Sequence, residues 1–250
     1  MLRLANVCVG DRLRDVSVDF ERGQRWVIVG PNGAGKSTLI KAALGLEPLS
    51  SGQVLLAGHD TGQMPRRQVA QACAWVPQHT DEASGFTGLE LALMGRLAHV
   101  GPLGLTSPAD AVRARELFAS LHAAHLVDKS LAEASGGERR LAFLVRALMQ
   151  APKILFLDEP TAFLDLKFQL EALRRVRDLS ATGLTSVVVL HDLNLAASFA
   201  THALLLKGGR VEHAGPSDTV FTAQNLSRLF EVDIARVGEG PPLFAVRSGP

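Results

Sequence analysis

The sequence of 250 residues contains no tyrosine, only two cysteines and almost no excess of one charge. Without a phenol, the chain cannot supply a tyrosine to a reaction or to a stacking site. Lys and Arg number 26 and Asp and Glu number 25, so the net charge of +1 argues against a broad basic surface for nucleic acid. The longest apolar runs, such as Val187 to Leu190, are far shorter than the roughly 18 residues that a membrane span needs.

The two cysteines, Cys8 and Cys73, have no CxxC spacing and so indicate neither a disulfide framework nor a redox motif. Each lies in an apolar stretch, and we therefore expect two buried thiols, as in a reducing compartment. The first residues lack the basic and then apolar pattern of a signal peptide. These features predict a soluble, cytoplasmic protein that could still bind a membrane protein.

Short apolar runs alternate with helical patterns along the chain. Strands are expected at 23–30, 53–57, 72–76, 154–157, 187–190 and 203–206, and helices at 36–46, 166–181 and 193–199. Between about residues 84 and 150, helical spacing dominates instead. The alternation is typical of an α/β fold with a parallel sheet, in which the helical block is an insertion. We expect one domain over 1–250, with its core at about 1–83 and 151–250 and a helical subdomain at about 84–150.

A glycine-rich segment between a predicted strand and a predicted helix matches the pattern GxxxxGK[ST]. Its glycines let backbone N–H groups converge on phosphate oxygens, and the start of the helix adds partial positive charge there. In this pattern, Lys36 reaches the β- and γ-phosphates of a nucleotide and the hydroxyl of Ser37 coordinates Mg²⁺. The predicted nucleotide-binding residues are Gly30, Pro31, Asn32, Gly33, Ala34, Gly35, Lys36, Ser37 and Thr38.

Two carboxylates follow the apolar run Ile154 to Leu157. A buried strand of this kind would deliver Asp158 to the Mg²⁺ ion and Glu159 to the neighbourhood of the γ-phosphate. A carboxylate in that place can orient water or accept its proton, an effect on the order of 10²–10⁴-fold in rate. The alternative, that the two acids only cap a helix, is weaker because the phosphate loop lies upstream.

The segment Ser135-Gly136-Gly137-Glu138 resembles the signature motif of the ATP-binding subunits of ABC transporters, and the resemblance covers nearly the whole chain. It implies a P-loop NTPase (RecA-like) fold: a mostly parallel sheet core, an N-terminal antiparallel β part and an inserted α-helical subdomain. It also implies that two copies pair head to tail. Each ATP then lies between the phosphate loop of one copy and the signature motif of the other.

Further positions carry the same resemblance. Gln78 resembles the Q-loop glutamine, which contacts Mg²⁺ and faces the membrane subunit, and Asp165 resembles the D-loop aspartate at the dimer seam. His191 resembles the switch histidine that contacts the γ-phosphate. The resemblance thus assigns catalysis to Glu159, His191 and Gln78, and Mg²⁺ binding to Ser37, Gln78 and Asp158.

Three positions depart from the family pattern. Ala134 replaces the leucine that usually opens the signature, and Leu141 stands where an arginine is common. The aromatic residue that stacks on adenine in the family would fall near Val9, which is aliphatic. We therefore expect weaker discrimination between ATP and GTP, with recognition of the triphosphate intact.

Three segments narrow the branch of the family: Leu93 to Arg96, His191 to Ala197 and Phe221 to Leu226 resemble importers of iron–siderophore, haem and cobalamin type. The resemblance implies an ATPase at the cytoplasmic face of the inner membrane. Its expected partners are a second copy of the chain, two transmembrane permease subunits and, indirectly, a substrate-binding protein. Importers of zinc, manganese or molybdate share parts of these segments and remain an alternative.

Other interpretations are weaker. An ABC ATPase acting on DNA or ribosomes would usually have tandem cassettes or long coiled-coil insertions, and no nucleic-acid partner is expected here. A regulator without turnover would tolerate the loss of Lys36, Glu159 and His191, which are present. His122 and His125 could bind a metal, but two ligands without cysteine or carboxylate support indicate a solvated helix end instead.

Overall fold

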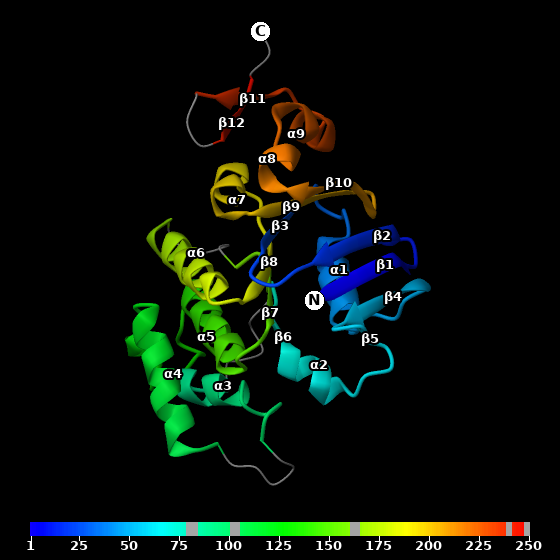
Figure 1. Ribbon diagram of the computed structural model, residues 1–250. Helices are drawn as coiled ribbons and strands as arrows, with labels where there is room; N and C mark the ends of the chain where they lie inside the picture. The colour runs from blue at the N-terminus through cyan, green and yellow to red at the C-terminus, as the bar shows by residue number, and fades with distance from the viewer. Residues whose placement is uncertain (79–84, 101–105, 161–165, 239–241, 248–250) are drawn as a thin grey trace. The chain divides into compact units, whose positions relative to one another are not determined.

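The computed structural model describes residues 1–78, 85–100, 106–160, 166–238 and 242–247 (Figure 1). The chain divides into two compact units. The first comprises Met1–Met64 and Thr185–Pro250, and the second comprises Pro65–Leu184. The predicted helical subdomain, at about 84–150, lies within the sequence range of the second unit, and its bounds stay a prediction.

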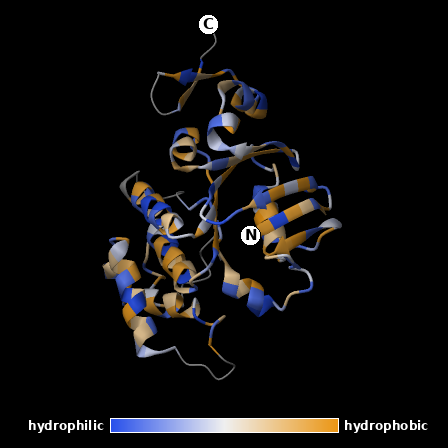
Figure 2. Cartoon of the chain, viewed as in Figure 1, coloured by the Kyte–Doolittle hydropathy of each residue, from blue (hydrophilic) through white to orange (hydrophobic). Residues whose placement is uncertain are grey.

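The first unit contains an antiparallel sheet with the strand order β2-β1-β4-β5. Its strands are β1 (Leu2–Val9), β2 (Leu13–Phe20), β4 (Ser51–Leu56) and β5 (His59–Asp60). Along β2, hydrophobic residues recur on one face and are buried, and hydrophilic residues lie between them (Figure 2). The expected N-terminal antiparallel part is therefore confirmed.

Cys8 corrects one expectation from the sequence. Its neighbours Val7 and Val9 point into the core, and the alternation of β1 turns Cys8 to the other face. Cys8 is therefore partly exposed, whereas Cys73 is buried as expected.

A second set of strands in the first unit is mostly parallel. These are β3 (Arg25–Val29), β8 (Thr185–Val189), β9 (His202–Lys207) and β10 (Arg210–Pro216). β3 pairs in parallel with both β8 and β9, and β10 returns antiparallel to β9. All five residues of β8 are buried, which is typical of a strand covered on both faces.

Helices and a small hairpin complete the first unit. They are α1 (Lys36–Ala43), α7 (Leu193–Phe199), α8 (Ser217–Val220), α9 (Ala223–Phe230) and the hairpin of β11 (Ile234–Val237) and β12 (Leu243–Val246). Figure 1 shows α8 beside β9 and β10.

The second unit joins a parallel strand pair to several helices. The pair is β6 (Cys73–Val76) and β7 (Ile154–Asp158), and β7 is buried along its whole length. The helices are α2 (Arg66–Ala72), α3 (Gly88–Met94), α4 (Pro108–Ser120), α5 (Gly136–Met149) and α6 (Leu166–Ala181), with a 3₁₀ turn at Ala124–Leu126. The predicted combination of parallel strands, antiparallel strands and a helical insertion is thus confirmed.

Candidate nucleotide-binding and hydrolysis site

The phosphate loop lies in the first unit, between the end of β3 and the start of α1. Gly35 has a left-handed φ of +102°, and a Cβ there would lie 2.6 Å from the carbonyl oxygen of Arg12. A Cβ on Gly30 would lie 2.1 Å from the carbonyl oxygen of Leu206. Only glycine fits at both positions, so the tight path of the loop depends on them.

Lys36 lies folded over this loop. Its side chain is 7% exposed, and its Nζ donates hydrogen bonds to the carbonyl oxygens of Gly30 (2.8 Å) and Pro31 (2.9 Å). The ammonium group of Lys36 therefore lies beside the phosphate loop, directly before the N-terminus of α1. A loop of this geometry at a helix N-terminus fits the phosphates of a nucleotide, as the sequence predicts.

His191 lies at the same sheet edge as the loop. β3 and β8 run parallel with Ile28 opposite Val189, so the chain after both strands emerges at one edge. Directly after His191, the Asp192 side chain accepts hydrogen bonds from the N–H groups of Asn194 (2.8 Å) and Leu195 (2.9 Å), which starts α7. This turn leaves His191 exposed beside the end of the strand. Its position is as predicted, and its role stays a prediction.

In the second unit, too, functional residues follow the carboxyl ends of two parallel strands, but here they are an amide and two carboxylates. β6 and β7 run parallel with Val76 opposite Leu157, and their carboxyl ends carry Gln78 and the pair Asp158-Glu159. The Nε2 of Gln78 donates a hydrogen bond of 2.9 Å to Oε2 of Glu159. The structure thus brings together two residues that are 81 positions apart and that the sequence assigned to catalysis.

Asp158 and Glu159 differ in their surroundings although they are adjacent. Asp158 ends β7 and is 2% exposed, whereas Glu159 is half-buried. The backbone of Glu159 has a φ of +52°, a left-handed conformation that non-glycine residues seldom adopt. Such conformations cost about 1–3 kcal/mol and cluster at functional sites.

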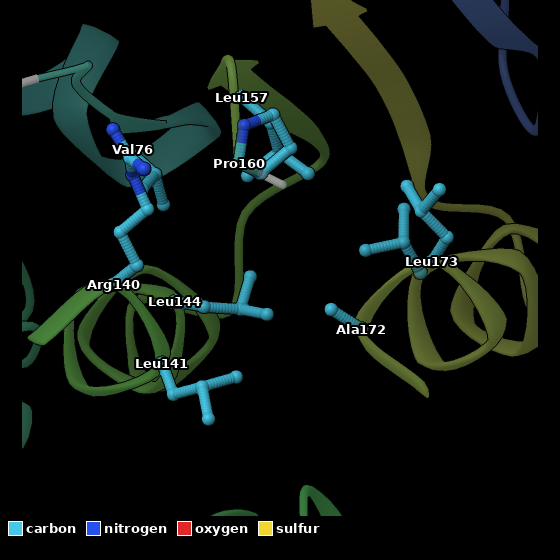
Figure 3. Close-up of a pocket in the computed structure, with 9 residues that line it drawn as sticks. Val76, Arg140, Leu141, Leu144, Leu157, Pro160, Ala172 and Leu173 are labelled. Carbon is cyan, nitrogen blue, oxygen red and sulfur yellow. The ribbon is translucent and has the colours of Figure 1, made fainter. Parts of the chain in front are cut away.

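Arg140 is a further member of this cluster that sequence reasoning missed. Its side chain lies between α5 and β6, beside a small apolar cavity lined by Leu144, Leu157 and Leu173 (Figure 3). The residue is 4% exposed, and its Nη2 donates a 2.6 Å hydrogen bond to the backbone carbonyl of Gln78. Arg140 of α5, the helix that begins in the signature motif, therefore contacts Gln78, and Gln78 in turn contacts Glu159.

The signature residues form the N-terminus of α5. Ser135 is the N-cap: its Oγ accepts a hydrogen bond from the N–H of Glu138 (3.2 Å), and the Glu138 carboxylate accepts one from the N–H of Ser135 (2.8 Å). This reciprocal capping box fixes the loop and directs Gly136 and Gly137 into the first turn. An exposed serine hydroxyl at the positive end of a helix of 14 residues fits an anion.

Asp165 lies outside the described residues. Val9 is 2% exposed, so its side chain faces the core and offers no surface to an adenine ring. Among the described residues, no group of three or more His, Cys, Asp and Glu side chains could hold a metal ion. In the same part of the chain, the helices are too short or too polar to cross a bilayer.

The first unit thus holds a glycine-rich phosphate loop between a strand and a helix, and the second holds Asp158 and Glu159 at the end of a buried strand. These two features define the class of the protein, a P-loop nucleotide-binding protein.

Comparison with known proteins narrows the class to a family. Residues 13–162 match the ABC transporter family. A hemin import ATP-binding protein of Agrobacterium fabrum is 37% identical over 244 residues, which are 93% of this chain and 92% of the relative. A cobalamin import ATP-binding protein of Halobacterium salinarum is 36% identical over 239 residues, 95% of this chain and 59% of the relative.

Solved structures agree with this assignment. A chain of an inward-facing, metal-chelate type ABC transporter superposes with a TM-score of 0.84 at 26% identity, covering 99% of this chain and 97% of the other. A dimeric bacterial ABC transporter cassette gives a TM-score of 0.78 at 26% identity, covering 87% and 99%. The protein belongs to the ABC transporter family, as an ATP-binding subunit with the predicted P-loop NTPase fold. ATP-binding subunits of this family hydrolyse ATP and form dimers.

Proposed function

We propose that the chain is the ATP-hydrolysing motor of an importer for a metal chelate of the haem, cobalamin or iron–siderophore class. The single observation that carries hydrolysis is the hydrogen bond between Gln78 and Glu159, because it fixes a carboxylate beside a buried aspartate at the carboxyl end of a strand. The substrate class is supported by the hemin and cobalamin import relatives. Import of zinc, manganese or molybdate is the second candidate.

In the proposed chemistry, ATP and Mg²⁺ are the ligands. Lys36 and the loop residues would bind the phosphates, and Ser37, Gln78 and Asp158 would hold the Mg²⁺ ion, which would neutralise phosphate charge. Glu159 orients the attacking water and accepts its proton, and His191 contacts the γ-phosphate. Hard oxygen ligands, a hydroxyl, an amide and a carboxylate, suit Mg²⁺.

The proposed assembly contains two copies of the chain and two membrane subunits. In it, Ser135 and the following glycines of one copy bind the γ-phosphate of ATP held by the other, and Asp165 lies at the seam. Two transmembrane permease subunits receive the motion, and an external substrate-binding protein delivers the cargo. This places the chain peripherally on the cytoplasmic face of the inner membrane, without a nucleic-acid partner.

A groove in the second unit is the surface that we propose for the permease. It encloses about 310 Å³, and its lining residues are Phe86, Glu90, Leu93, Met94, Leu97 and Thr106. Leu97 is 62% exposed and Phe86 is 37% exposed, so the apolar lining of the groove is open to a partner. We assign the groove to a short cytoplasmic helix of the permease, with apolar residues for the floor and a basic residue for Glu90.

The hydrolysis proposal is tested with Glu159→Gln, which keeps the shape of the side chain but removes the base. We expect loss of turnover, unchanged ATP binding and an ATP-dependent dimer in size-exclusion chromatography. Glu116→Gln, on the exposed face of α4, is the matched control. ATP hydrolysis by Glu159→Gln at the wild-type rate would show that Glu159 is not the base.

The groove is tested with Leu97→Asp, which places a charge on the apolar surface. We expect ATPase activity of the isolated chain to persist, while co-purification with the permease and its stimulation of the ATPase are lost. Val112→Asp, at a residue of α4 that is 58% exposed, should leave both intact. Stimulation by DNA or ribosomes, with none by the permease, would instead favour a non-transport ATPase.

A further inference from the structure

Glu138, the last residue of the signature segment, is held by two side chains from the segment before α5. Lys129 Nζ lies 3.1 Å from Oε1 and 3.0 Å from Oε2, and His125 Nε2 lies 2.9 Å from Oε1. Because a carboxylate only accepts, Lys129 and His125 both donate. Burial raises the pKa of Glu138, but hydrogen bonds from the N–H of Ser135, from Lys129 and from His125 outweigh it and lower the pKa to about 2.

The capping box alone does not require this arrangement. α3 begins with the same box, in which Thr87 and Glu90 exchange hydrogen bonds. Within the described residues, no ion pair reaches Glu90. A box with a glutamate therefore forms in this chain without a basic partner. The box of α4 has one cation, since Arg96 lies 3.0 Å from Asp110, whereas Glu138 has two side-chain donors.

The negative charge of Glu138 explains why two side chains donate to it. The proposed function requires the N-terminus of α5 to accept a phosphate of ATP, next to Ser135. An ionised carboxylate at the third position of the helix satisfies the N–H of Ser135 but repels this second anion. A cation that binds both carboxylate oxygens removes most of the repulsion while it keeps the capping geometry.

We propose that Lys129, assisted by His125, is a positioning residue of the signature site: it neutralises Glu138, so that the start of α5 can bind the phosphate of ATP held by a second copy. The inference rests on the proposed head-to-tail dimer. It explains why a segment outside the signature motif, at 125–129, folds back onto it.

The test is a double-mutant cycle in the full chain with Glu159→Gln as the parent. The readout is the ATP concentration that gives half-maximal dimer, with ATP binding by the protomer measured separately. Lys129→Met keeps the alkyl chain and should raise this concentration about tenfold, whereas Lys129→Arg should restore it. Arg115→Ala removes the cation that pairs with Asp128 (3.5 Å) and is the matched control, expected to change nothing.

The discriminating step combines Lys129→Met with Glu138→Gln. With no carboxylate to neutralise, Lys129→Met should now change the half-maximal concentration less than about twofold. An equal loss in both backgrounds, or no loss in either, would overturn the proposal while leaving the dimer intact. If the parent forms no dimer with ATP, the proposed function fails and this inference with it.

Discussion

Arg140→Met tests whether the buried arginine of α5 sets the position of the catalytic carboxylate. Removal of the guanidinium takes a 2.6 Å hydrogen bond from the carbonyl of Gln78, a residue that is partly buried. A hydrogen bond from a charged donor contributes about 1.5–3 kcal/mol to stability, so the melting temperature should fall by several degrees. Glu159 receives its own hydrogen bond from Gln78, and its displacement by about 1 Å could lower kcat on the order of 10²-fold.

The assay separates chemistry from binding. We expect kcat at saturating ATP to fall between about tenfold and a hundredfold, with ATP affinity of the protomer nearly unchanged because Lys36 and its loop bind the phosphates. Arg140→Lys retains a charged donor and should recover part of kcat. Arg146→Met removes an arginine from the same helix, one that lies over the Phe143 ring, and is the control.

Two results would refute the reasoning. A folded Arg140→Met variant with kcat within twofold of the wild type would show that the Arg140–Gln78 contact does not position Glu159. An equal fall of kcat in Arg146→Met would show that any loss of charge from α5 has this effect.

Three further predictions concern other sites. At pH 8, an alkylating reagent should modify Cys8 but not Cys73. Hydrogen bonds from Ser51 and from the N–H of Asp15 lower the thiol pKa of Cys8, whereas burial raises the pKa of Cys73 to about 12. Equal rates of modification would contradict this. Folding lowers the pKa of Glu138 from 4.5 to about 2, which adds up to about 3 kcal/mol to the free energy of unfolding. This contribution is complete above pH 4.5 and is lost as the pH falls towards 2. Acid titration monitored by circular dichroism should show a smaller loss in Glu138→Gln, and identical curves would disprove it. ATP and GTP should be hydrolysed with similar kcat/KM, because Val9, which stands where the family has its stacking aromatic residue, is aliphatic and buried; a strong preference for ATP would refute this.

The site residues that the sequence identified are those whose chemistry is local. The phosphate loop is eight consecutive residues between a strand and a helix, and Asp158 and Glu159 directly follow an apolar run. A capping box is also local, since Ser135 and Glu138 are three positions apart. Such patterns need no knowledge of the tertiary fold, so they can be found in the sequence alone.

The residues that the sequence did not identify act across the chain. Arg140 meets Gln78 over 62 positions, and nothing around either residue indicates the contact. His125 is exposed in a 3₁₀ turn, as expected of a solvated helix end, and it also contacts Glu138, a contact that the sequence did not indicate. Cys8 was expected in the core because its neighbours are apolar, and the period of the strand, rather than composition, decides its exposure.

The backbone of Glu159 shows how these distant contacts serve the local motif. A left-handed conformation at a residue with a Cβ is unfavourable, and nothing in the sequence Asp-Glu-Pro demands it. Such conformations persist when surrounding interactions fix them. Two successive hydrogen bonds, from Arg140 to the Gln78 carbonyl and from the Gln78 side chain to the Glu159 carboxylate, connect the side chain of this residue to α5. We therefore expect the motif to supply the carboxylate and α5, through Arg140 and Gln78, to restrain where that carboxylate points.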